Sequence, residues 1–505
     1  MSNKFYITTP LYYVNASPHI GHSYTNIAAD CLARYMRRLL GKENVWFLTG
    51  TDEHGQKVQR AAEAEGLAPQ KFVDKMVLTF KNLWKELNIS YNDFIRTTEE
   101  RHISVVRRVL EILYQRGDVY EAKYEGWYCT PCETFWTETQ TQDQACPDCK
   151  RPLEKIAETN YFFKLSHYQG WLIDYIKNNP DFIRPQIRQR EVLSFLELNK
   201  LTDLCISRPK ERLSWGIPLP FSKEHVTYVW FDALINYISA VGEFDSKGEY
   251  KSKWWPADLH LIGKDILRQH AIYWPIILKA LNIDPPKTIF AHGWWLIGES
   301  KMSKSRGNVV SPSDMVDNFG VDTYRYFLLR DVPFGLDGNF SEDAIIKRFN
   351  SDLANDLGNL VYRTLTMIEK YFQGGIPQLD IRSIKYNTQG ENIKEKITFL
   401  LSNEVSIRLQ VGFDFSSALE KIWELINMAN KYIEDTKPWN LDKENKTEEL
   451  KSFIRLLVDV IRGVAEQIYP FMPQTAESIK DQIGQDKIKK GKPLFPRIDN
   501  LTPGT

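Results

Sequence analysis

The chain has 505 residues, which at about 150 residues per domain predicts about three domains. Its 65 basic and 65 acidic side chains cancel, which excludes a protein held to nucleic acid by bulk positive charge. A hydrophobic fraction of 43% and a charged fraction of 26% exclude a disordered or fibrous chain. No apolar run reaches the roughly 18 residues that span a bilayer, and the first residues show no signal or transit pattern, so we expect a cytoplasmic protein without membrane contact.

The first part of the chain alternates strand and helix patterns. Apolar residues predict a strand over Phe5–Thr9 and then, after a loop with two prolines, a helix that stops near Gly41. Val45–Leu48 is typical of a second buried strand, and helices are expected over Leu67–Leu87 and Ile103–Gln115. This order favours an α/β fold with a Rossmann-like parallel sheet.

The sequence pattern changes twice in the later part of the chain. Residues 117–222 are aromatic, Thr-rich and Cys-bearing, which indicates an insertion between residues 1–116 and 223–290 of the sheet domain. The sheet pattern resumes with expected strands at Val226–Ala233, His260–Ile262 and Thr288–Trp295 and a helix at Arg268–Leu281. Residues 291–345 form a connecting region, and long amphipathic segments predict a helical bundle over 346–505.

A histidine pair lies where the first strand's loop enters the first helix. His19 and His22 flank Gly21, beside the amide groups at the positive end of the predicted helix, where phosphate binds readily. Gly21 allows a flat base or a phosphate to approach the backbone closely. The alternative is that one or both histidines only cap the helix.

Four cysteines form one local block inside the insertion, at about residues 124–155. Their spacing is typical of a zinc knuckle, and Pro131 and Pro147 favour tight turns within each pair. Because four thiolates fill the coordination shell, the ion is expected to be structural; the alternative is four unmetallated thiols. The predicted ligands are Cys129, Cys132, Cys146 and Cys149.

A basic, small-residue loop follows the last strand pattern. Lys301, Lys304 and Arg306, with two serines between them, could hold a pyrophosphate; the alternative is a solvated basic turn. The chain contains neither a GxGxxG nor a GxxxxGK[ST] motif, so this loop and the histidine pair must replace those phosphate cradles if ATP binds.

Together, His19-Ile20-Gly21-His22 and Lys301-Met302-Ser303-Lys304-Ser305 resemble the two signatures of class I aminoacyl-tRNA synthetases. Longer strings narrow the resemblance, over nearly the whole chain, to the methionyl-tRNA synthetase family. These strings are Thr8-Thr9-Pro10-Leu11-Tyr12-Tyr13-Val14-Asn15, Gly50-Thr51-Asp52-Glu53-His54-Gly55, Trp215-Gly216-Ile217-Pro218, Val229-Trp230-Phe231-Asp232-Ala233 and Gly263-Lys264-Asp265-Ile266.

The resemblance implies an enzyme that attaches L-methionine to its initiator and elongator tRNAs through a methionyl-adenylate, releasing AMP and pyrophosphate. Asp52 is expected to bind the substrate ammonium, and Tyr13 and His270 to offer hydrogens to the sulfur or to each other. Aromatic core packing is the alternative role for the aromatic members. The implied methionine site contains Leu11, Tyr13, Asp52, Trp230, Ala233, Leu234, Tyr237, Ile266, His270 and Trp274.

For the nucleotide, the resemblance implies that His19, Gly21 and His22 bind ATP with Gly263 and Asp265. Lys301 and Lys304 then hold the departing pyrophosphate with Mg²⁺. Catalysis is assigned to both histidines and both lysines.

At the other end, the resemblance implies an anticodon-binding helical domain in which Trp439 stacks on a base and Asn355 contributes a contact. Since no further β-rich module follows, a monomer is expected. Two alternatives remain open: a cysteinyl-type synthetase, which needs an open zinc position, and a catalytically silent tRNA-binding protein.

Overall fold

The computed structural model describes residues 3–129, 134–136, 141, 144–147, 150–297, 300–301, 310–378, 386–400 and 405–498, without the side chains of residues 124, 134–136, 297, 300 and 301. The chain divides into two compact units, Met1–His292 and Gly293–Thr505.

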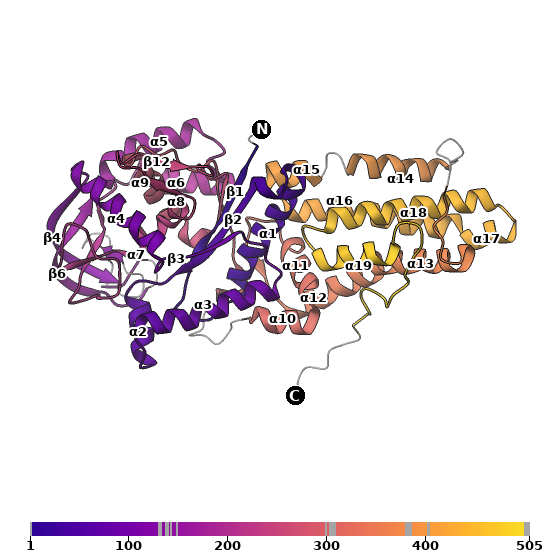
Figure 1. Ribbon diagram of the computed structural model, residues 1–505, viewed down its shortest axis with the longest axis horizontal. Helices are drawn as coiled ribbons and strands as arrows, with labels where there is room; N and C mark the ends of the chain where they lie inside the picture. The colour runs from indigo at the N-terminus through magenta and orange to yellow at the C-terminus, as the bar shows by residue number, and fades with distance from the viewer. Residues whose placement is uncertain are drawn as a thin grey trace. The chain divides into compact units, whose positions relative to one another are not determined.

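A parallel sheet of the predicted type forms the centre of the first unit (Figure 1). Its strand order is β3-β2-β1-β13-β14-β7, and all neighbouring pairs run parallel. The carboxyl ends of its strands therefore meet at one edge, which is where α/β sheets bind ligands. The strands are β1 (Phe5–Tyr13), β2 (Val45–Asp52), β3 (Asp93–Arg96), β7 (Ile183–Arg184), β13 (Leu259–Gly263) and β14 (Ile289–His292).

The four helices predicted from the sequence of this unit are present, and the one expected over Arg268–Leu281 begins as a π-helix at Gln269–Tyr273. The first helix begins at Ile20 and ends at Leu40, where Gly41 adopts a φ of 91° and donates its N–H to Arg37. Pro69 opens the third helix in the first turn, where its missing N–H costs nothing. The helices are α1 (Ile20–Leu40), α2 (Gln56–Ala64), α3 (Pro69–Glu86), α4 (Glu100–Gln115), α5 (Gln169–Asn178), α6 (Gln186–Leu198), α7 (Val229–Leu234), α8 (Asn236–Ser239) and α9 (Trp274–Ala280).

One predicted strand is wrong. The apolar run 226–233 contains only the short strand β10 (His225–Thr227), after which the chain turns into α7. A short apolar run cannot by itself separate a buried strand from a buried helix. Here Phe231 and Asp232 are both fully buried, so the helix carries a charged side chain into the interior.

The predicted insertion contains an antiparallel sheet of order β5-β4-β6-β8. Strand β7 also lies within the insertion, but it pairs with β14 and so extends the parallel sheet. The other strands of the insertion are β4 (Val119–Cys129), β5 (Thr134–Trp136), β6 (Glu154–Phe163), β8 (Leu204–Cys205) and β9 (Ser207–Pro209), and β11 (Gly242–Phe244) and β12 (Tyr250–Ser252) form a hairpin after it.

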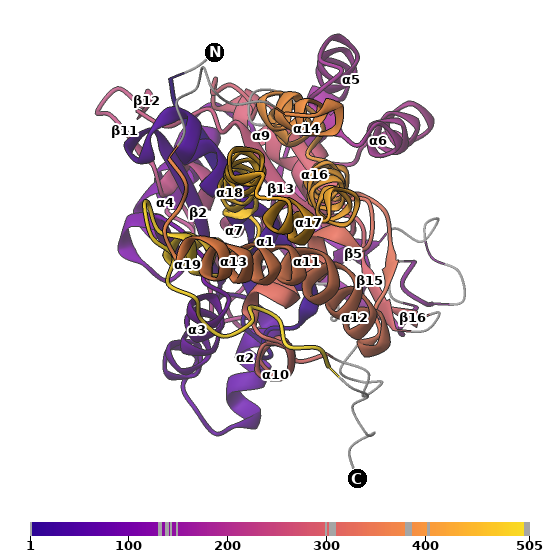
Figure 2. The ribbon, with the colours of Figure 1, turned by 90° about the vertical axis from the view of Figure 1, so that its right-hand side faces the viewer.

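The second unit is mainly helical, as predicted. Helices α13, α16 and α18 pack side by side, and α19 packs against α18 (Figure 1, Figure 2). Among the described residues, none of the helices is both long and apolar enough to cross a membrane. The elements of the second unit are β15 (Trp295–Ile297), β16 (Ser300–Lys301), β17 (Gly338–Asn339), α10 (Pro312–Phe319), α11 (Val321–Arg330), α12 (Glu342–Arg348), the π-helix η7 (Phe349–Gly358), α13 (Asn359–Phe372), α14 (Thr388–Phe399), α15 (Val405–Ile407), α16 (Phe415–Thr436), α17 (Pro438–Lys443), α18 (Thr447–Ile468) and α19 (Pro473–Ile483).

Candidate functional site

The two histidines of the first signature cap α1 reciprocally. His19 is the N-cap residue; its Nδ1 accepts the Gly21 N–H at 3.1 Å, and its own N–H is accepted by Nδ1 of His22 at 3.1 Å. Because both Nδ1 atoms accept hydrogen bonds, each neutral ring carries its proton on Nε2. The capping alternative and the phosphate-binding prediction are therefore compatible: one nitrogen of each ring caps the helix and the other is a donor.

Aromatic side chains fix the plane of the His22 ring. Tyr12 meets it edge-on at a centroid distance of 4.9 Å, and Phe80 of α3 lies 5.7 Å away. The Tyr12 hydroxyl accepts a hydrogen bond from Asn26 Nδ2 at 2.6 Å. A Cβ at Gly21 would lie 3.0 Å from a ring carbon of His19, so glycine leaves the room that this ring needs.

The ammonium-binding candidate Asp52 ends strand β2, where it is 7% exposed. Its Cα is in register with that of Tyr13 at the end of β1, so both residues reach the same edge of the sheet. The next residue, Glu53, is fully buried and accepts hydrogen bonds from Arg96 at 2.7 and 2.9 Å. The Arg96–Glu53 pair thus anchors the chain directly after Asp52.

The predicted sulfur-contacting residues form a buried hydrogen-bond chain. His270 Nδ1 lies 2.9 Å from the Ile266 carbonyl, which can only accept, so Nδ1 carries the proton. Nε2 then accepts the hydroxyl proton of Tyr237 at 2.7 Å. From the sequence we expected His270 to donate a hydrogen bond to the sulfur or to Tyr13. In the structure its hydrogen-bond partners are Tyr237 and Ile266.

A second histidine, missed by the sequence analysis, supports this chain. Trp274 donates its indole N–H to His260 Nε2 at 3.1 Å, and His260 Nδ1 donates to the Thr8 hydroxyl at 2.7 Å. The Tyr237 ring stacks on His260 at a centroid distance of 4.2 Å. These contacts fix the rings of Tyr237 and Trp274 in the site.

Burial lowers the pKa of both histidines: that of His270 to about 4, and that of His260 well below its usual value. Both rings are therefore neutral at pH 7. Since the unfolded chain takes up these protons near pH 6.5 and the folded chain does not, their contribution to stability is complete above pH 6.5 and is lost as the pH falls.

We expect the free energy of unfolding to fall between pH 6.5 and 4 with a slope approaching about 1.4 kcal/mol per pH unit for each ring. Denaturant unfolding at stepped pH values measures the slope, and His270→Gln should reduce it. His167→Gln, at an exposed histidine, is the matched control and should leave it unchanged. Equal slopes in the His270 variant and the wild type would contradict the assignment.

The structure brings most of the predicted methionine residues together. Leu234, Tyr237 and Trp274 belong to one buried core cluster, against which Leu11 and Ile266 pack. Trp230 and Ala233 lie on α7. Gly263 ends strand β13 and Asp265 follows it, at the same carboxyl edge of the sheet. Lys304 lies outside the described residues, and of Lys301 only the backbone, in β16, is described.

The structure describes part of the predicted zinc knuckle, including two of its four cysteines. Cys129 and Cys146 are both fully buried and form a small core cluster with Leu153, against which Trp127 packs. The Cys146 N–H donates to the Arg151 carbonyl at 2.8 Å, and the Cys146 carbonyl accepts from Lys150 at 2.8 Å. This tight turn is of the predicted kind; Cys132 and Cys149 lie outside the described residues.

The two anticodon candidates lie in the second unit on separate helices. Trp439 lies in α17 and is 42% exposed. Lys437, between α16 and α17, caps the end of α16 in a left-handed conformation with a φ of 48°. Asn355 is exposed on η7. Asn350, on the same π-helix, is occupied by two hydrogen bonds to the backbone of Ile498.

Sequence analysis also missed a buried polar cluster beside Asp52. Asp232 of α7 accepts hydrogen bonds from His54 and from His102. A charged residue inside the apolar string Val229–Ala233 was the available signal, because a buried carboxylate needs partners.

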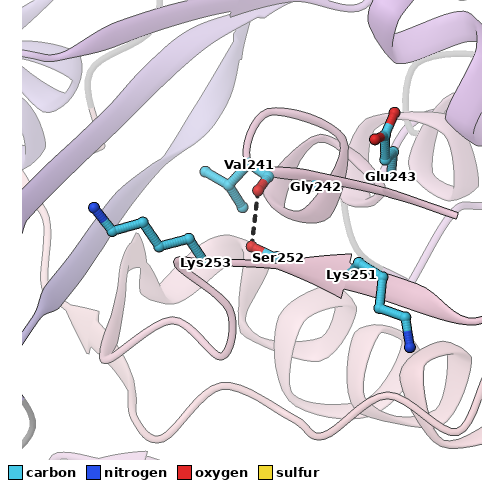
Figure 3. A pocket seen from close by; sticks show the side chains of 6 residues that line it. All are labelled: Val241, Gly242, Glu243, Lys251, Ser252 and Lys253. Atoms are coloured by element: carbon cyan, nitrogen blue, oxygen red, sulfur yellow. Dashed lines mark hydrogen bonds between the residues drawn. The ribbon is translucent and has the colours of Figure 1, made fainter. Parts of the chain in front are cut away.

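A hollow beside the β11–β12 hairpin is not this site. Figure 3 shows its lining residues, Val241–Glu243 and Lys251–Lys253, with the Ser252 hydroxyl donating to the Val241 carbonyl at 2.8 Å. None of the predicted site residues lines it. Of the two lysines that line the hollow, Lys251 is paired with Glu249 at 2.6 Å.

Comparison with known proteins decides the family. Residues 5–365 match the family described as tRNA synthetases class I (M), and residues 401–497 match the anticodon-binding domain of tRNA ligases. The methionine–tRNA ligase of Clostridium acetobutylicum is 50% identical over 98% of this chain and 78% of its own length. The chain belongs to the methionyl-tRNA synthetase family.

Other members of this family agree. The methionine–tRNA ligase of Bacillus subtilis is 43% identical over 99% of this chain and 78% of its own length. A Mycobacterium tuberculosis methionyl-tRNA synthetase in complex with methionyl-adenylate matches with a TM-score of 0.90 and 38% identity, covering 98% of this chain and 100% of that one. As a member of the methionyl-tRNA synthetase family, the chain is a class I ligase that attaches methionine to tRNA at the expense of ATP.

Proposed function

We propose that the residues assembled at the carboxyl edge of the sheet form methionyl-adenylate from L-methionine and ATP. The observation that carries this proposal is the His19–His22 pair: both Nδ1 atoms accept backbone N–H groups at the start of α1, so each neutral ring carries its proton on Nε2, a donor that suits phosphate. The ligand of the Mycobacterium tuberculosis relative, a methionyl-adenylate, supports it.

In this proposal the two ends of methionine meet different groups. Asp52, at the end of β2, binds the ammonium, beside Tyr13 at the end of β1. Tyr237 and Trp274 enclose the thioether. Because burial raises the pKa of Tyr237, its hydroxyl stays protonated and can turn from His270 Nε2 to the sulfur, a weak acceptor.

The reaction needs no general base, since the methionine carboxylate is already ionised at neutral pH. A carboxylate oxygen bonds to the α-phosphorus of ATP as the bond from that phosphorus to the bridging oxygen of pyrophosphate breaks. The Nε2–H groups of His19 and His22 donate to the phosphate oxygens and stabilise their growing charge. The 2′-hydroxyl of the terminal adenosine of tRNA then attacks the adenylate carbonyl, which gives methionyl-tRNA and AMP.

Lys304, helped by Lys301, is proposed to neutralise the departing pyrophosphate. The support is chemical: a loop with three cations and two hydroxyls suits a polyanion. Mg²⁺ bound with ATP supplies further neutralisation of the phosphates. Gly263 and Asp265 are proposed to place the adenosine, from their position at the carboxyl end of strand β13.

ATP–pyrophosphate exchange with each of the twenty amino acids tests the proposal. Exchange that depends on methionine and on no other amino acid is the expected result. Exchange with cysteine would instead support the cysteinyl alternative, and no exchange with any amino acid would support a silent tRNA-binding protein.

For the insertion we propose one structural zinc ion held by Cys129, Cys132, Cys146 and Cys149. The two described thiols fit such a site, because they are buried together outside the main core and one of them sits in a tight turn. Within the described residues, which omit the other two cysteines, no group of three or more His, Cys, Asp or Glu side chains is arranged to hold a metal ion. A shell of four thiolates leaves no open position for a reacting water.

Elemental analysis of freshly purified protein should give about one zinc per chain. Cys146→Ser should lose the metal and lower the thermal unfolding midpoint, because the small cluster with Leu153 cannot hold the insertion alone. Cys31→Ala, at a cysteine buried in α1, is the matched control and should retain the metal. Less than half an equivalent of zinc in the wild type would contradict the proposal.

At the anticodon end, we propose that the exposed indole of Trp439 stacks on a base, with Asn355 contributing a polar contact. Stacking on an aromatic side chain contributes about 1–3 kcal/mol, so Trp439→Ala should lower kcat/KM for tRNA by about 5- to 150-fold. ATP–pyrophosphate exchange should not change in this variant. Equal charging of tRNA by the variant and the wild type would remove the stacking role.

We further propose, from the sequence analysis, that the protein is a monomer and works in the cytoplasm. Light scattering coupled to size-exclusion chromatography measures the mass; a value near 59.0 kDa is expected, and twice that value would contradict it.

A further inference from the structure

A buried carboxylate, that of Asp232, links helix α7 to the residues that follow Asp52. Asp232 lies in the middle of α7, between the pocket residues Trp230 and Ala233, and is fully buried. Its Oδ2 lies 2.7 Å from Nδ1 of His54, two residues after Asp52. Its Oδ1 lies 2.7 Å from Nε2 of His102 at the start of α4.

The proton positions in this cluster are determined by its geometry. A carboxylate that bonds with both oxygens only accepts, so His54 donates from Nδ1 and His102 from Nε2. The other nitrogen of His102, Nδ1, then accepts the hydroxyl proton of Ser239, on α8, at 2.8 Å. Burial alone would raise the pKa of Asp232, but its interactions with His54 and His102 outweigh burial and lower this pKa, so the carboxylate is ionised.

The loop that begins directly after Asp52 (the Asp52 loop) is fixed on two sides. Glu53 is held by Arg96, and its carbonyl accepts the indole N–H of Trp215 at 2.6 Å. His54 is held by Asp232 and packs against the same indole at a centroid distance of 5.3 Å. Asp52 is thus followed by two residues whose side chains are both bound to buried partners.

We infer that Asp232 is a positioning residue: through His54 and His102 it holds the Asp52 loop and helix α7 in one arrangement and thereby sets the affinity for methionine. This rests on the proposed roles of Asp52 and Trp230. None of the three cluster residues touches the substrate in this account. Their contribution is to keep the ammonium-binding carboxylate and the side-chain pocket at the separation that methionine requires.

The two histidines allow a crossed test, because each donates from a different ring nitrogen. The amide nitrogen of asparagine takes the place of Nδ1, and that of glutamine takes the place of Nε2. His54→Asn and His102→Gln therefore keep the bond to Asp232, whereas His54→Gln and His102→Asn misplace it. Side-chain size cannot explain the result, since the better substitute differs between the two positions.

In methionine-dependent ATP–pyrophosphate exchange, His54→Gln and His102→Asn should raise the KM for methionine at least about tenfold, the scale of one hydrogen bond to a charged group. The KM for ATP should stay within about twofold of wild type, and the bond-keeping variants should stay within about threefold in both constants. Asp232→Asn should behave as the bond-breaking variants do.

Three results would overturn the inference: equal KM values for methionine within each pair, parallel rises in the KM for methionine and for ATP, or a wild-type KM in folded Asp232→Asn. If the bond-breaking variants do not fold, Ser239→Ala removes only the hydroxyl that orients His102, and an unchanged KM for methionine there would overturn it equally. The proposed function is tested apart from this inference by the wild type, whose exchange with methionine does not depend on how the variants behave.

Discussion

Replacing His22 by alanine is expected to lower methionine-dependent ATP–pyrophosphate exchange by about 10²- to 10³-fold, the cost of losing one donor to a transition-state oxyanion. The reason is that the two ring nitrogens differ in role: Nδ1 caps α1, and Nε2–H is the donor that we propose for phosphate. The loss should fall on kcat, because the phosphate charge that this donor stabilises develops during the reaction.

Two further variants separate capping from catalysis at this position. His22→Asn keeps an acceptor near the place of Nδ1, so it should preserve the cap and the thermal unfolding midpoint while losing activity as alanine does. His22→Gln keeps a donor near the place of Nε2 and should retain more activity than either. If His22→Asn were as active as wild type, the ring would serve the helix alone.

Asp52→Asn is expected to weaken methionine binding by at least about 10²-fold, because the buried ammonium loses its counter-charge. Asp52 is only 7% exposed, so solvent cannot replace the lost carboxylate. Isothermal titration with methionine measures the affinity, and circular dichroism confirms that the variant is folded.

The matched control for Asp52 is Asp245→Asn, in the turn between β11 and β12, which makes the same chemical change away from the site. It should bind methionine as the wild type does. Unchanged affinity in Asp52→Asn, or equal losses in both variants, would exclude Asp52 as the ammonium-binding group.

Local patterns predicted the parts of the fold that local chemistry determines. The first helix ends before Gly41 because only a residue that tolerates a φ of 91° fits there, and glycine is the signal for that conformation. The parallel sheet followed from the alternation of strand and helix patterns. The strand expected over Val226–Ala233 failed because burial on all sides gives strand and helix the same apolar signature.

The site could be predicted as a set of residues but not as a network. The family resemblance implies His19, His22, Asp52 and Tyr237, yet nothing in the local sequence indicates that His54 bonds a residue 178 positions later. Likewise, the two functions of each histidine ring depend on which nitrogen the helix cap uses, and that is visible only in the folded geometry. Long-range polar pairs are set by tertiary packing, so single-sequence reasoning misses them.

The central claim is that the two histidines and the lysine loop act on one bound nucleotide. A crystal structure of the protein with a non-hydrolysable methionyl-adenylate analogue and pyrophosphate tests it most directly. The account predicts Nε2 of His19 and His22 within hydrogen-bond distance of the phosphate oxygens, and the Lys304 ammonium on the pyrophosphate. Phosphate groups bound out of reach of the histidines and of Lys304 would contradict it.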